Sequence, residues 1–139
     1  MATNLNTSDR VMRETLSKAR TIAVVGHSDN PGRTSYNIAQ YLRHAGYTVY
    51  PVNPTVSEID GEKSYASLAD VPEPIDIVNV FRRSEHVAGV VDEAIDVGAK
   101  AIWTQLGVVD EAAAQRAIDA GIDVAMNRCI KVEHMRLGA

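Results

Sequence analysis

The chain has 139 residues, 45% of them hydrophobic, and a net charge of −4 at pH 7, so it fits one compact domain and lacks the basic excess of a nucleic-acid-binding protein. No apolar run approaches the roughly 20 residues that a membrane span needs, and the polar N-terminal segment does not resemble a signal peptide. The single cysteine, Cys129, excludes an internal disulfide and suits a reducing compartment, so we expect a cytoplasmic protein with no membrane or nucleic-acid partner.

The first part of the chain predicts a helix, a strand and a second helix. Residues 1–6 are typical of a disordered lead, and Thr7 or Ser8 can cap the first helix. The strand at 22–25 is apolar throughout, which is typical of a central parallel strand covered on both faces. A polar loop separates it from a helix at 34–44.

The remainder of the sequence keeps alternating strands and helices. We expect strands at 47–52, 75–80, 101–103 and 122–125, helices at 84–97 and 110–120, a polar loop at 55–65, a short helical turn at 66–69, and a turn or short helix at 128–137. Glycines and prolines between these segments supply the breaks that short connections require.

This alternation predicts an α/β fold: a Rossmann-like, three-layer arrangement in which a five-stranded parallel sheet carries helices on both faces, as one domain over residues 1–139. We expect the strand order 3-2-1-4-5. Ligands of such sheets bind outside the carboxyl ends of the strands, where the strand order reverses. The candidate functional residues are therefore those that directly follow each strand.

The loop after the first strand, residues 26–33, has the composition of a phosphate site. An apolar strand ends at Gly26, and a polar loop then enters a helix, whose unpaired N–H groups and dipole attract an anion. Gly26 and Gly32 are six positions apart, which does not match the G-x-G-x-x-G spacing of dinucleotide sites. The loop indicates a nucleotide-like ligand and disfavours a standard NAD site.

The next two loops narrow the choice of nucleotide. The second strand ends at Asn53-Pro54 without the carboxylate that holds the ribose hydroxyls of NAD. The third strand is followed by Phe81-Arg82-Arg83, which combines a ring face with two guanidinium groups. This combination favours a phosphorylated adenosine, as in NADP or coenzyme A (CoA). The alternative is that both arginines are ordinary surface residues.

Two histidines and the cysteine are the candidates for chemistry. His27 has no evident orienting partner in the sequence, as a general acid or base would need. Cys129 and His134 are too few ligands for a structural zinc site, and we expect Glu133 to form ion pairs with Arg128 or Arg136 instead. We predict no catalytic and no metal-binding residue.

Four motifs together resemble a known family. They are Gly26-His27-Ser28-Asp29-Asn30-Pro31-Gly32, Pro51-Val52-Asn53-Pro54, Asp76-Ile77-Val78-Asn79-Val80-Phe81-Arg82 and Asn127-Arg128-Cys129-Ile130-Lys131-Val132-Glu133-His134. In this order they look like the small stand-alone CoA-binding proteins, which are similar to the N-terminal CoA-binding domain of the succinyl-CoA synthetase α subunit. The resemblance covers residues 10–137.

The resemblance implies a Rossmann-like domain that holds CoA across the strand ends. Positions that correspond to CoA contacts of the synthetase are Ser28, Asp29, Asn30 and Pro31 in the first loop and Thr104, Gln105 and Leu106 after the fourth strand. Val56 stands where the synthetase has a basic residue, so Arg33, Arg82 or Arg83 would have to replace that phosphate contact. The synthetase domain that carries the phosphorylated histidine has no counterpart, so ligase activity does not transfer.

We therefore predict a non-catalytic protein that binds CoA or an acyl-CoA at the carboxyl ends of the strands. The expected cofactor-binding residues are Gly26, His27, Ser28, Asp29, Asn30, Pro31, Arg33, Asn53, Pro54, Phe81, Arg82, Arg83, Thr104, Gln105 and Leu106. One alternative is an enzyme that uses NADP or an acyl-CoA, with His27 or Cys129 in its chemistry. Another is a cofactor-binding subunit whose protein partner supplies catalysis.

Overall fold

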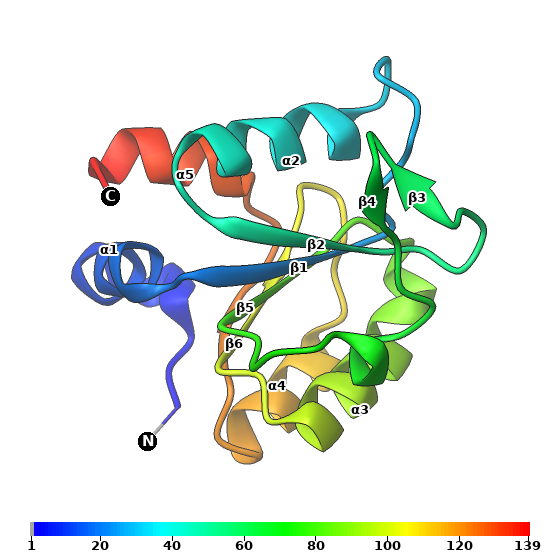
Figure 1. The fold of residues 1–139 in the computed structure, drawn as a ribbon. Coiled ribbons are helices and arrows are strands. Elements are labelled where there is room, and N and C mark those ends of the chain that lie inside the picture. Colours follow the sequence, from blue (N-terminus) through cyan, green and yellow to red (C-terminus); the bar gives the residue numbers. More distant parts are fainter. Residues whose placement is uncertain (1) are drawn as a thin grey trace.

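The computed structural model describes residues 2–139, and in them a five-stranded parallel sheet lies between two layers of helices (Figure 1). The strands of this sheet are β1 (Thr21–Val25), β2 (Thr48–Val52), β5 (Ile77–Val80), β6 (Ala101–Thr104) and β7 (Asp123–Ala125). The helices are α1 (Asp9–Lys18), α2 (Thr34–His44), α3 (Val87–Val97), α4 (Glu111–Asp119) and α5 (Ile130–Leu137). The predicted α/β, Rossmann-like class is confirmed.

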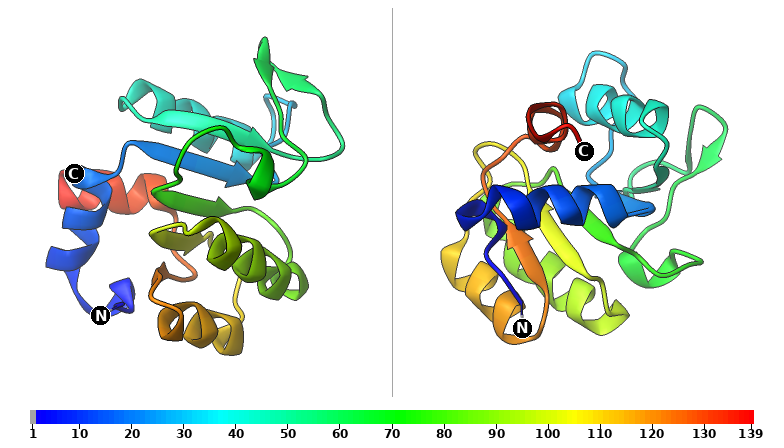
Figure 2. Two further views of the ribbon diagram at one scale, coloured as in Figure 1. Left: turned by 60° about the horizontal axis from the view of Figure 1, so that its bottom comes forward. Right: turned by 90° about the vertical axis from the view of Figure 1, so that its left-hand side faces the viewer.

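Helices cover both faces of the sheet (Figure 2), and each face carries its own apolar cluster. On one face α1, α2 and α5 pack through residues such as Leu16, Leu42 and Ile130, together with the indole of Trp103. On the other face α3 and α4 pack through short side chains, of which Val91 and Ala117 are fully or almost fully buried. Covering both faces explains why β1, β5 and β6 are buried along their whole length.

The predicted strand order 3-2-1-4-5 is wrong, because the observed order is β2-β1-β5-β6-β7, or 2-1-3-4-5 when the strands of the large sheet alone are counted. The second strand therefore lies at an edge, and the third lies inside the sheet next to β1. Pro51 in β2 gives the physical reason, since proline has no N–H for a ladder on both sides and is confined to sheet edges. The reversal of strand order lies between β1 and β5.

The prediction of a disordered segment at residues 1–6 is also wrong for residues 2–6, which are ordered against the sheet. Met1 lies outside the described residues. Leu5 is fully buried, and Asn4 pairs with Val124 along the free edge of β7. The Thr3 carbonyl accepts a hydrogen bond from Val124 at 3.0 Å. Burial of one leucine and pairing of a sheet edge outweigh the polar composition of the segment. Of the two predicted caps for the first helix, Ser8 caps α1.

Two short elements interrupt the polar loop predicted at 55–65. β3 (Glu58–Ile59) and β4 (Glu62–Lys63) form an antiparallel hairpin, which turns through Asp60 and Gly61 at φ values of 51° and 83°. Tyr36 of α2 donates a hydrogen bond to the Asp60 carboxylate, which ties the hairpin to that helix. Single helical turns complete the chain: η1 (Leu5–Thr7), η2 (Leu68–Asp70) and η3 (Ser84–His86), the last of which leads into α3. In residues 2–139 no helix is long and apolar enough to cross a membrane.

Candidate functional site at the carboxyl ends of the strands

Two adjoining pockets lie at the strand ends, where the strand order reverses. The polar pocket, of about 530 Å³, is lined by Gly26, Ser28, Asp29, Gly32, Arg33, Thr34, Ser35, Asn53, Thr55, Val56 and Phe81. The apolar pocket, of about 590 Å³, is lined by Thr34, Ile38, Phe81, Arg82, Arg83, Gln105, Leu106, Gly107, Val108 and Cys129. Thr34 and Phe81 line both pockets, so the two form one continuous groove over the ends of β1, β5 and β6.

Gly26 sets the path of the first loop by its lack of a side chain. Its φ is +87°, and a Cβ atom placed there would lie 2.4 Å from the Phe81 carbonyl oxygen. The Gly26 N–H donates to the Val52 carbonyl at 2.9 Å. The glycine therefore allows β1, β2 and β5 to end together, and its contribution to the groove is close packing of the strand ends.

Hydrogen bonds within the loop after β1 hold it in a fixed shape. The Ser28 N–H donates to Ser35 Oγ at 3.0 Å, the Asn30 N–H to Ser28 Oγ at 3.0 Å, and the Gly32 N–H to Asn30 Oδ1 at 2.8 Å. These side chains thus accept hydrogen bonds from loop N–H groups, so those N–H groups are not free to bind an anion. Ser28 and Asn30 work on the loop itself, and Asn30 does not line either pocket.

Other amides of the same loop are left for a ligand. Among the hydrogen bonds of residues 2–139, none is donated by the Asp29 N–H. Helix α2 begins after Arg33, whose side chain makes no capping bond, so the first-turn N–H groups of Thr34 and Ser35 have no helical acceptor. Asp29, Thr34 and Ser35 all line the polar pocket. The positive end of the α2 dipole and these amides favour an anion there.

The arginines at the groove differ in their partners. Arg33 lines the polar pocket and Arg82 the apolar pocket, and neither forms an ion pair within residues 2–139. Arg83 also lines the apolar pocket, but its side chain is 85% exposed and lies 3.9 Å from Glu85. Arg33 and Arg82 are therefore the cations best placed to meet a phosphate.

Asn53, at the end of β2, connects the loops on that side. Its Nδ2 donates to the His27 carbonyl at 2.9 Å, and its Oδ1 accepts from the Thr55 hydroxyl at 2.7 Å. Its own carbonyl accepts from Ser64 at 3.0 Å. The Asn53 amide is thus committed to protein partners, while Thr55 and Val56 also face the polar pocket. Pro54 lies outside the lining of both pockets.

The loops after β6 and β7 support each other. The Thr104 hydroxyl donates to the Val108 carbonyl at 2.7 Å and accepts from the Asn127 N–H at 2.9 Å. Asn127, at a φ of +59°, accepts the Gly107 N–H on its side-chain oxygen at 2.8 Å. Thr104 is therefore a buried connector that does not reach the groove. Leu106 is 65% exposed and lies at the rim of the apolar pocket.

Gln105 sits at the centre of a buried polar network behind the apolar pocket. Its Oε1 accepts from Asn79 Nδ2 at 3.3 Å and from the Ile130 N–H at 3.1 Å, which anchors the start of α5 to the sheet. Because both bonds go to the amide oxygen, the Nε2 group of Gln105 is the part free to face a ligand. The side chain is only 6% exposed.

His27 lies behind the groove and has no exposed surface. Its Nδ1 is 2.8 Å from the Ser28 carbonyl oxygen, and its Nε2 is 3.2 Å from Nη2 of Arg43. Burial holds the pKa of this imidazole below its usual 6.5. These contacts make His27 part of the loop's support and keep it out of reach of a ligand in either pocket.

The carboxyl-terminal cluster is structural. Glu133 is buried and pairs with both arginines named for it, at 3.6 Å to Arg128 and 2.5 Å to Arg136, as predicted. His134 Nδ1 lies 2.7 Å from the Tyr41 hydroxyl, and burial lowers the pKa of this imidazole too. Cys129, half-buried, lines the apolar pocket. Within residues 2–139 no three His, Cys, Asp or Glu side chains are grouped as metal ligands would be.

The groove brings together most of the residues expected from the sequence. The predicted residues that line it are Gly26, Ser28, Asp29, Arg33, Asn53, Phe81, Arg82, Arg83, Gln105 and Leu106. Those outside its lining are His27, Asn30, Pro31, Pro54 and Thr104. Sequence reasoning did not include Thr34, Ser35 and Ile38, although their position at the start of α2 was available as a signal. Cys129, which was not among the expected cofactor-binding residues, also lines the apolar pocket.

Known proteins resemble this chain over nearly its whole length. Residues 20–135 match the family described as CoA binding domain. An uncharacterised protein of Bacillus subtilis (strain 168), YneT, is 46% identical over 129 residues, which are 93% of this chain and 96% of that protein. The structure of a hypothetical protein from Pyrococcus horikoshii OT3 has a TM-score of 0.91 at 38% identity and covers 95% of this chain and 93% of its own.

A more distant relative is much longer. The ADP-forming acetate–CoA ligase of Methanocaldococcus jannaschii is 32% identical over 85 residues, which are 61% of this chain. The matched segment makes up 12% of the ligase. The similarity therefore concerns one region of a larger protein, and most of the ligase has no counterpart in this chain.

Proposed function

The chain belongs to the CoA binding domain family, and from this membership we propose that it binds coenzyme A or an acyl-CoA across the carboxyl ends of its strands without catalysing a reaction. The observation that carries the proposal is the polar pocket. Unpaired amides of Asp29, Thr34 and Ser35 converge there beside Arg33, and they suit the phosphates of such a ligand.

The two pockets match the two ends of CoA. The polar pocket offers amides, hydroxyls and a guanidinium for the diphosphate and the phosphorylated ribose. The apolar pocket offers Ile38, Phe81 and Val108 for the uncharged pantetheine arm. Arg82 lies at the junction, since its Cδ atom is close to Gly26, and can reach a phosphate from the apolar side. The proposed contacts are the predicted residues that line the groove, apart from the exposed Arg83, together with Thr34, Ser35 and Ile38.

Ligand choice tests this function directly. Calorimetric titration should show tighter binding of CoA than of NAD or NADP, because the end of β2 has no ribose-binding carboxylate and the first loop lacks the dinucleotide spacing. Native mass spectrometry should detect a CoA-sized ligand that copurifies. Binding of NAD at least as tight as that of CoA would overturn the proposal.

A matched pair of variants separates the groove from the rest of the surface. Thr34→Tyr places a ring where the two pockets meet and should abolish CoA binding. Thr48→Tyr makes the same change at an exposed position of β2, at the opposite end of the strands, and should leave binding unchanged. Equal affinity of both folded variants would place the ligand elsewhere.

The absence of catalysis is tested with acetyl-CoA. We expect no turnover, because neither imidazole near the groove is placed to activate Cys129: His27 is bonded to Ser28 and Arg43, and His134 to Tyr41. Hydrolysis of acetyl-CoA that disappears in Cys129→Ser would instead support the enzyme alternative, since Cys129 is the one thiol in the chain.

The similarity to one region of a ligase favours a second candidate function. The matched segment is a small fraction of the acetate–CoA ligase, so this chain is also suited to act as a cofactor-binding subunit beside a protein that carries other domains. Affinity purification from the native organism distinguishes the two functions. A stoichiometric partner that confers ligase activity would favour the subunit, and recovery of the chain with CoA alone would favour the stand-alone binder.

A further inference from the structure

The surroundings of His27 determine which of its nitrogens carries the proton. Nδ1 lies 2.8 Å from the Ser28 carbonyl oxygen, which can only accept a hydrogen bond. Nε2 lies 3.2 Å from a guanidinium nitrogen of Arg43, which can only donate. Both bonds exist together only when Nδ1 is protonated and Nε2 is not. His27 is therefore a neutral imidazole in the Nδ1–H form.

The bond to Ser28 has a consequence for the next amide. In a planar trans peptide the C=O of one residue and the N–H of the following residue point in opposite directions. Because the Ser28 carbonyl points to the buried imidazole, the Asp29 N–H points away from it. Asp29 is exposed and lines the polar pocket, and its N–H has no acceptor within residues 2–139. His27 thus orients an amide that faces the pocket.

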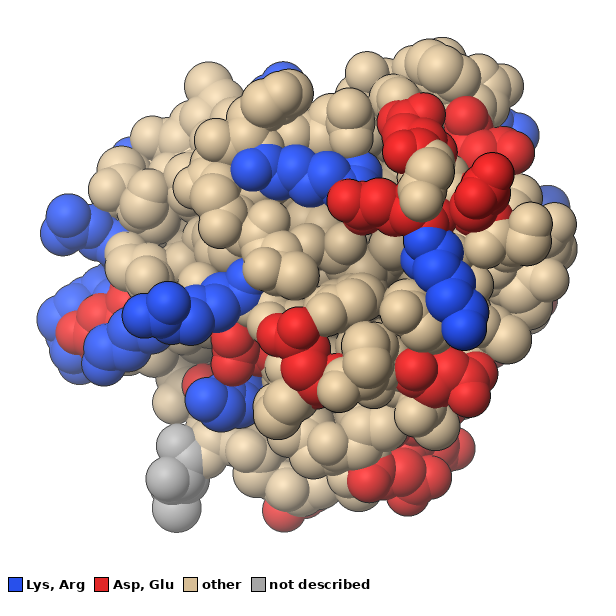
Figure 3. Space-filling model, in the orientation of Figure 1, with Lys and Arg blue, Asp and Glu red and all other residues tan. Residues whose placement is uncertain are grey.

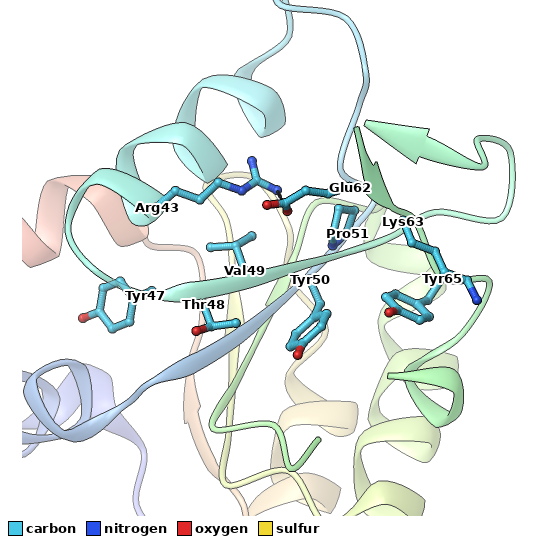
Figure 4. A pocket seen from close by; sticks show the side chains of 9 residues that line it. All are labelled: Arg43, Tyr47, Thr48, Val49, Tyr50, Pro51, Glu62, Lys63 and Tyr65. Atoms are coloured by element: carbon cyan, nitrogen blue, oxygen red, sulfur yellow. Dashed lines mark ion pairs between the residues drawn. The ribbon is translucent and has the colours of Figure 1, made fainter. Parts of the chain in front are cut away.

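Arg43 connects this arrangement to the hairpin. Figure 4 shows its side chain reaching from α2 along the outer edge of β2 toward Glu62 of β4, where its Nη2 lies 3.6 Å from the carboxylate. Its Nη1 donates to Gln40 at 2.7 Å, while its buried Nε has no partner. The Arg43 side chain is 20% exposed and lines a separate pocket of about 500 Å³ beside β2. Gln40 and Glu62 therefore fix the position of the Arg43 guanidinium, which in turn holds His27.

The charges that face His27 come from two elements. Arg43 of α2 is the cation next to Nε2, and the ring of Tyr36, also on α2, lies with its centroid 6.1 Å away. Asp60 lies in the hairpin turn and its charge acts on His27. Figure 3 shows acidic side chains gathered on the side of the molecule where the hairpin lies. Burial is the main cause that lowers the pKa of His27. The bond to Ser28 and the charge of Asp60 oppose it, and Arg43 adds to it.

We propose that His27 is a positioning residue, which in its neutral Nδ1–H form, held by Arg43, keeps the Ser28–Asp29 peptide turned toward the phosphates, so that protonation of His27 weakens CoA binding. A proton on Nε2 would place two donors and two positive charges face to face across the present 3.2 Å contact. The imidazole or the guanidinium must then move, and the loop loses its support. This inference rests on the proposed function and adds a regulation of the same site by pH.

Calorimetry of CoA binding across pH tests the proposal. At about pH 8 we expect Arg43→Met to bind CoA about tenfold more weakly than the wild type, and Arg43→Lys, which keeps a donor and its charge, to recover most of the loss. As pH falls through the folded-state pKa of His27, which burial holds below 6.5, the ratio of the two dissociation constants should fall toward about one, because the wild type then loses the same contact. This ratio cancels the titration of the CoA phosphates. Arg10→Met, an exposed arginine of α1 paired with Glu14, should behave as the wild type at every pH.

Nuclear magnetic resonance of the free protein makes the test independent of the ligand. We expect ¹⁵N shifts of the Nδ1–H form at His27, and an Asp29 amide shift that follows the protonation of His27. Three results would overturn the proposal. The first is a folded Arg43→Met variant that binds CoA with wild-type affinity at about pH 8, and the second is a ratio of dissociation constants that does not change with pH. The third is an NMR spectrum that shows His27 in the Nε2–H form. Failure of the wild type to bind CoA would overturn the proposed function instead. If Arg43→Met does not fold, Arg43→Lys and the wild-type NMR titration decide.

Discussion

The two pockets of the groove are built in different ways. In the polar pocket the loop after β1 is held by bonds between residues two to seven positions apart, such as Asn30 to Ser28 and Ser28 to Ser35. In the apolar pocket the side-chain bonds between different loops join residues 20 to 26 positions apart, such as Gly107 to Asn127 and Asn79 to Gln105, although Val108 is also bonded to Thr104, four positions away. The polar half is thus held mainly by short-range bonds, with the bonds of Asn53 and Arg43 to His27 joining it to more distant residues, whereas the apolar half depends on how β5, β6 and α5 meet. This difference predicts that a substitution within one half will affect mainly that pocket, whereas a substitution where the halves meet will affect both pockets.

The largest effect is expected where the two halves meet. Gly26→Ala combines a φ of +87° with a Cβ atom 2.4 Å from the Phe81 carbonyl, and Phe81 lines both pockets. We expect a loss of roughly 3 kcal/mol or more in the free energy of unfolding, measured by urea denaturation, and a loss of CoA binding.

The control for this change is Gly46→Ala. Gly46 has a φ of +104°, but nothing lies within 4 Å of the position of its Cβ. It should therefore cost only the backbone strain, about 1–2 kcal/mol. Equal losses in the two variants would show that the clash with Phe81 relaxes easily and does not hold the halves together.

The arginines distinguish the halves by charge. Arg33→Ala and Arg82→Ala should each weaken CoA binding by about 1.5–3 kcal/mol if each makes a charge-assisted bond to a phosphate. Arg83→Ala is the matched control, because this exposed side chain already lies near Glu85, and it should change binding by less than about 0.5 kcal/mol.

Dephospho-CoA then identifies the phosphate that each arginine reads. Replacing the arginine that contacts the 3′-phosphate should not weaken binding of dephospho-CoA. Replacing an arginine that contacts the diphosphate should weaken binding of CoA and of dephospho-CoA alike. If Arg83→Ala weakened CoA binding as much as Arg82→Ala does, the exposure of the Arg83 side chain would not keep it from contacting the ligand.

Stability should fall in acid because of two histidines, His27 and His134, that both contact side chains of α2. Burial lowers the pKa of both His27 and His134 below 6.5, so the unfolded chain binds protons at a higher pH than the folded one. Their contribution is complete above pH 6.5 and is lost as pH falls through the folded-state pKa values. Urea midpoints at about pH 8 and about pH 5.5 should show the decrease. His134→Gln should reduce it in part, and an unchanged pH dependence in that variant would remove His134 from the account.

The smallest effect is expected at Cys129. Although its side chain faces the apolar pocket, Cys129→Ser keeps nearly the same size and removes no hydrogen bond, so CoA affinity should change by less than about 1 kcal/mol. Calorimetry of the variant checks this, with circular dichroism to show that the fold is intact. Loss of binding would mean that the thiol itself contacts the ligand.

Local sequence predicted most strands and helices well, because their apolar periodicity reflects burial that any layered α/β fold would give. The Ser8 cap and the pairing of Glu133 followed from side-chain chemistry at short range. The strand order was not predicted correctly, although Pro51 was a usable signal that the second strand lies at an edge of the sheet. The lead at residues 1–6 was misjudged because a polar composition hides the one buried leucine, Leu5.

The sequence by itself determined that a polar loop follows a buried strand and leads into a helix, and that arginines stand near this loop, because these features depend on neighbours in the chain. Only the tertiary structure decided which of these groups can reach a ligand. It placed His27 behind the loop and Thr104 between two loops, and it brought Cys129 to the apolar pocket from the far end of the chain. The physical reason is that a buried polar group takes the partners that packing supplies, and here these include residues distant in sequence, Arg43 for His27 and Asn127 for Thr104.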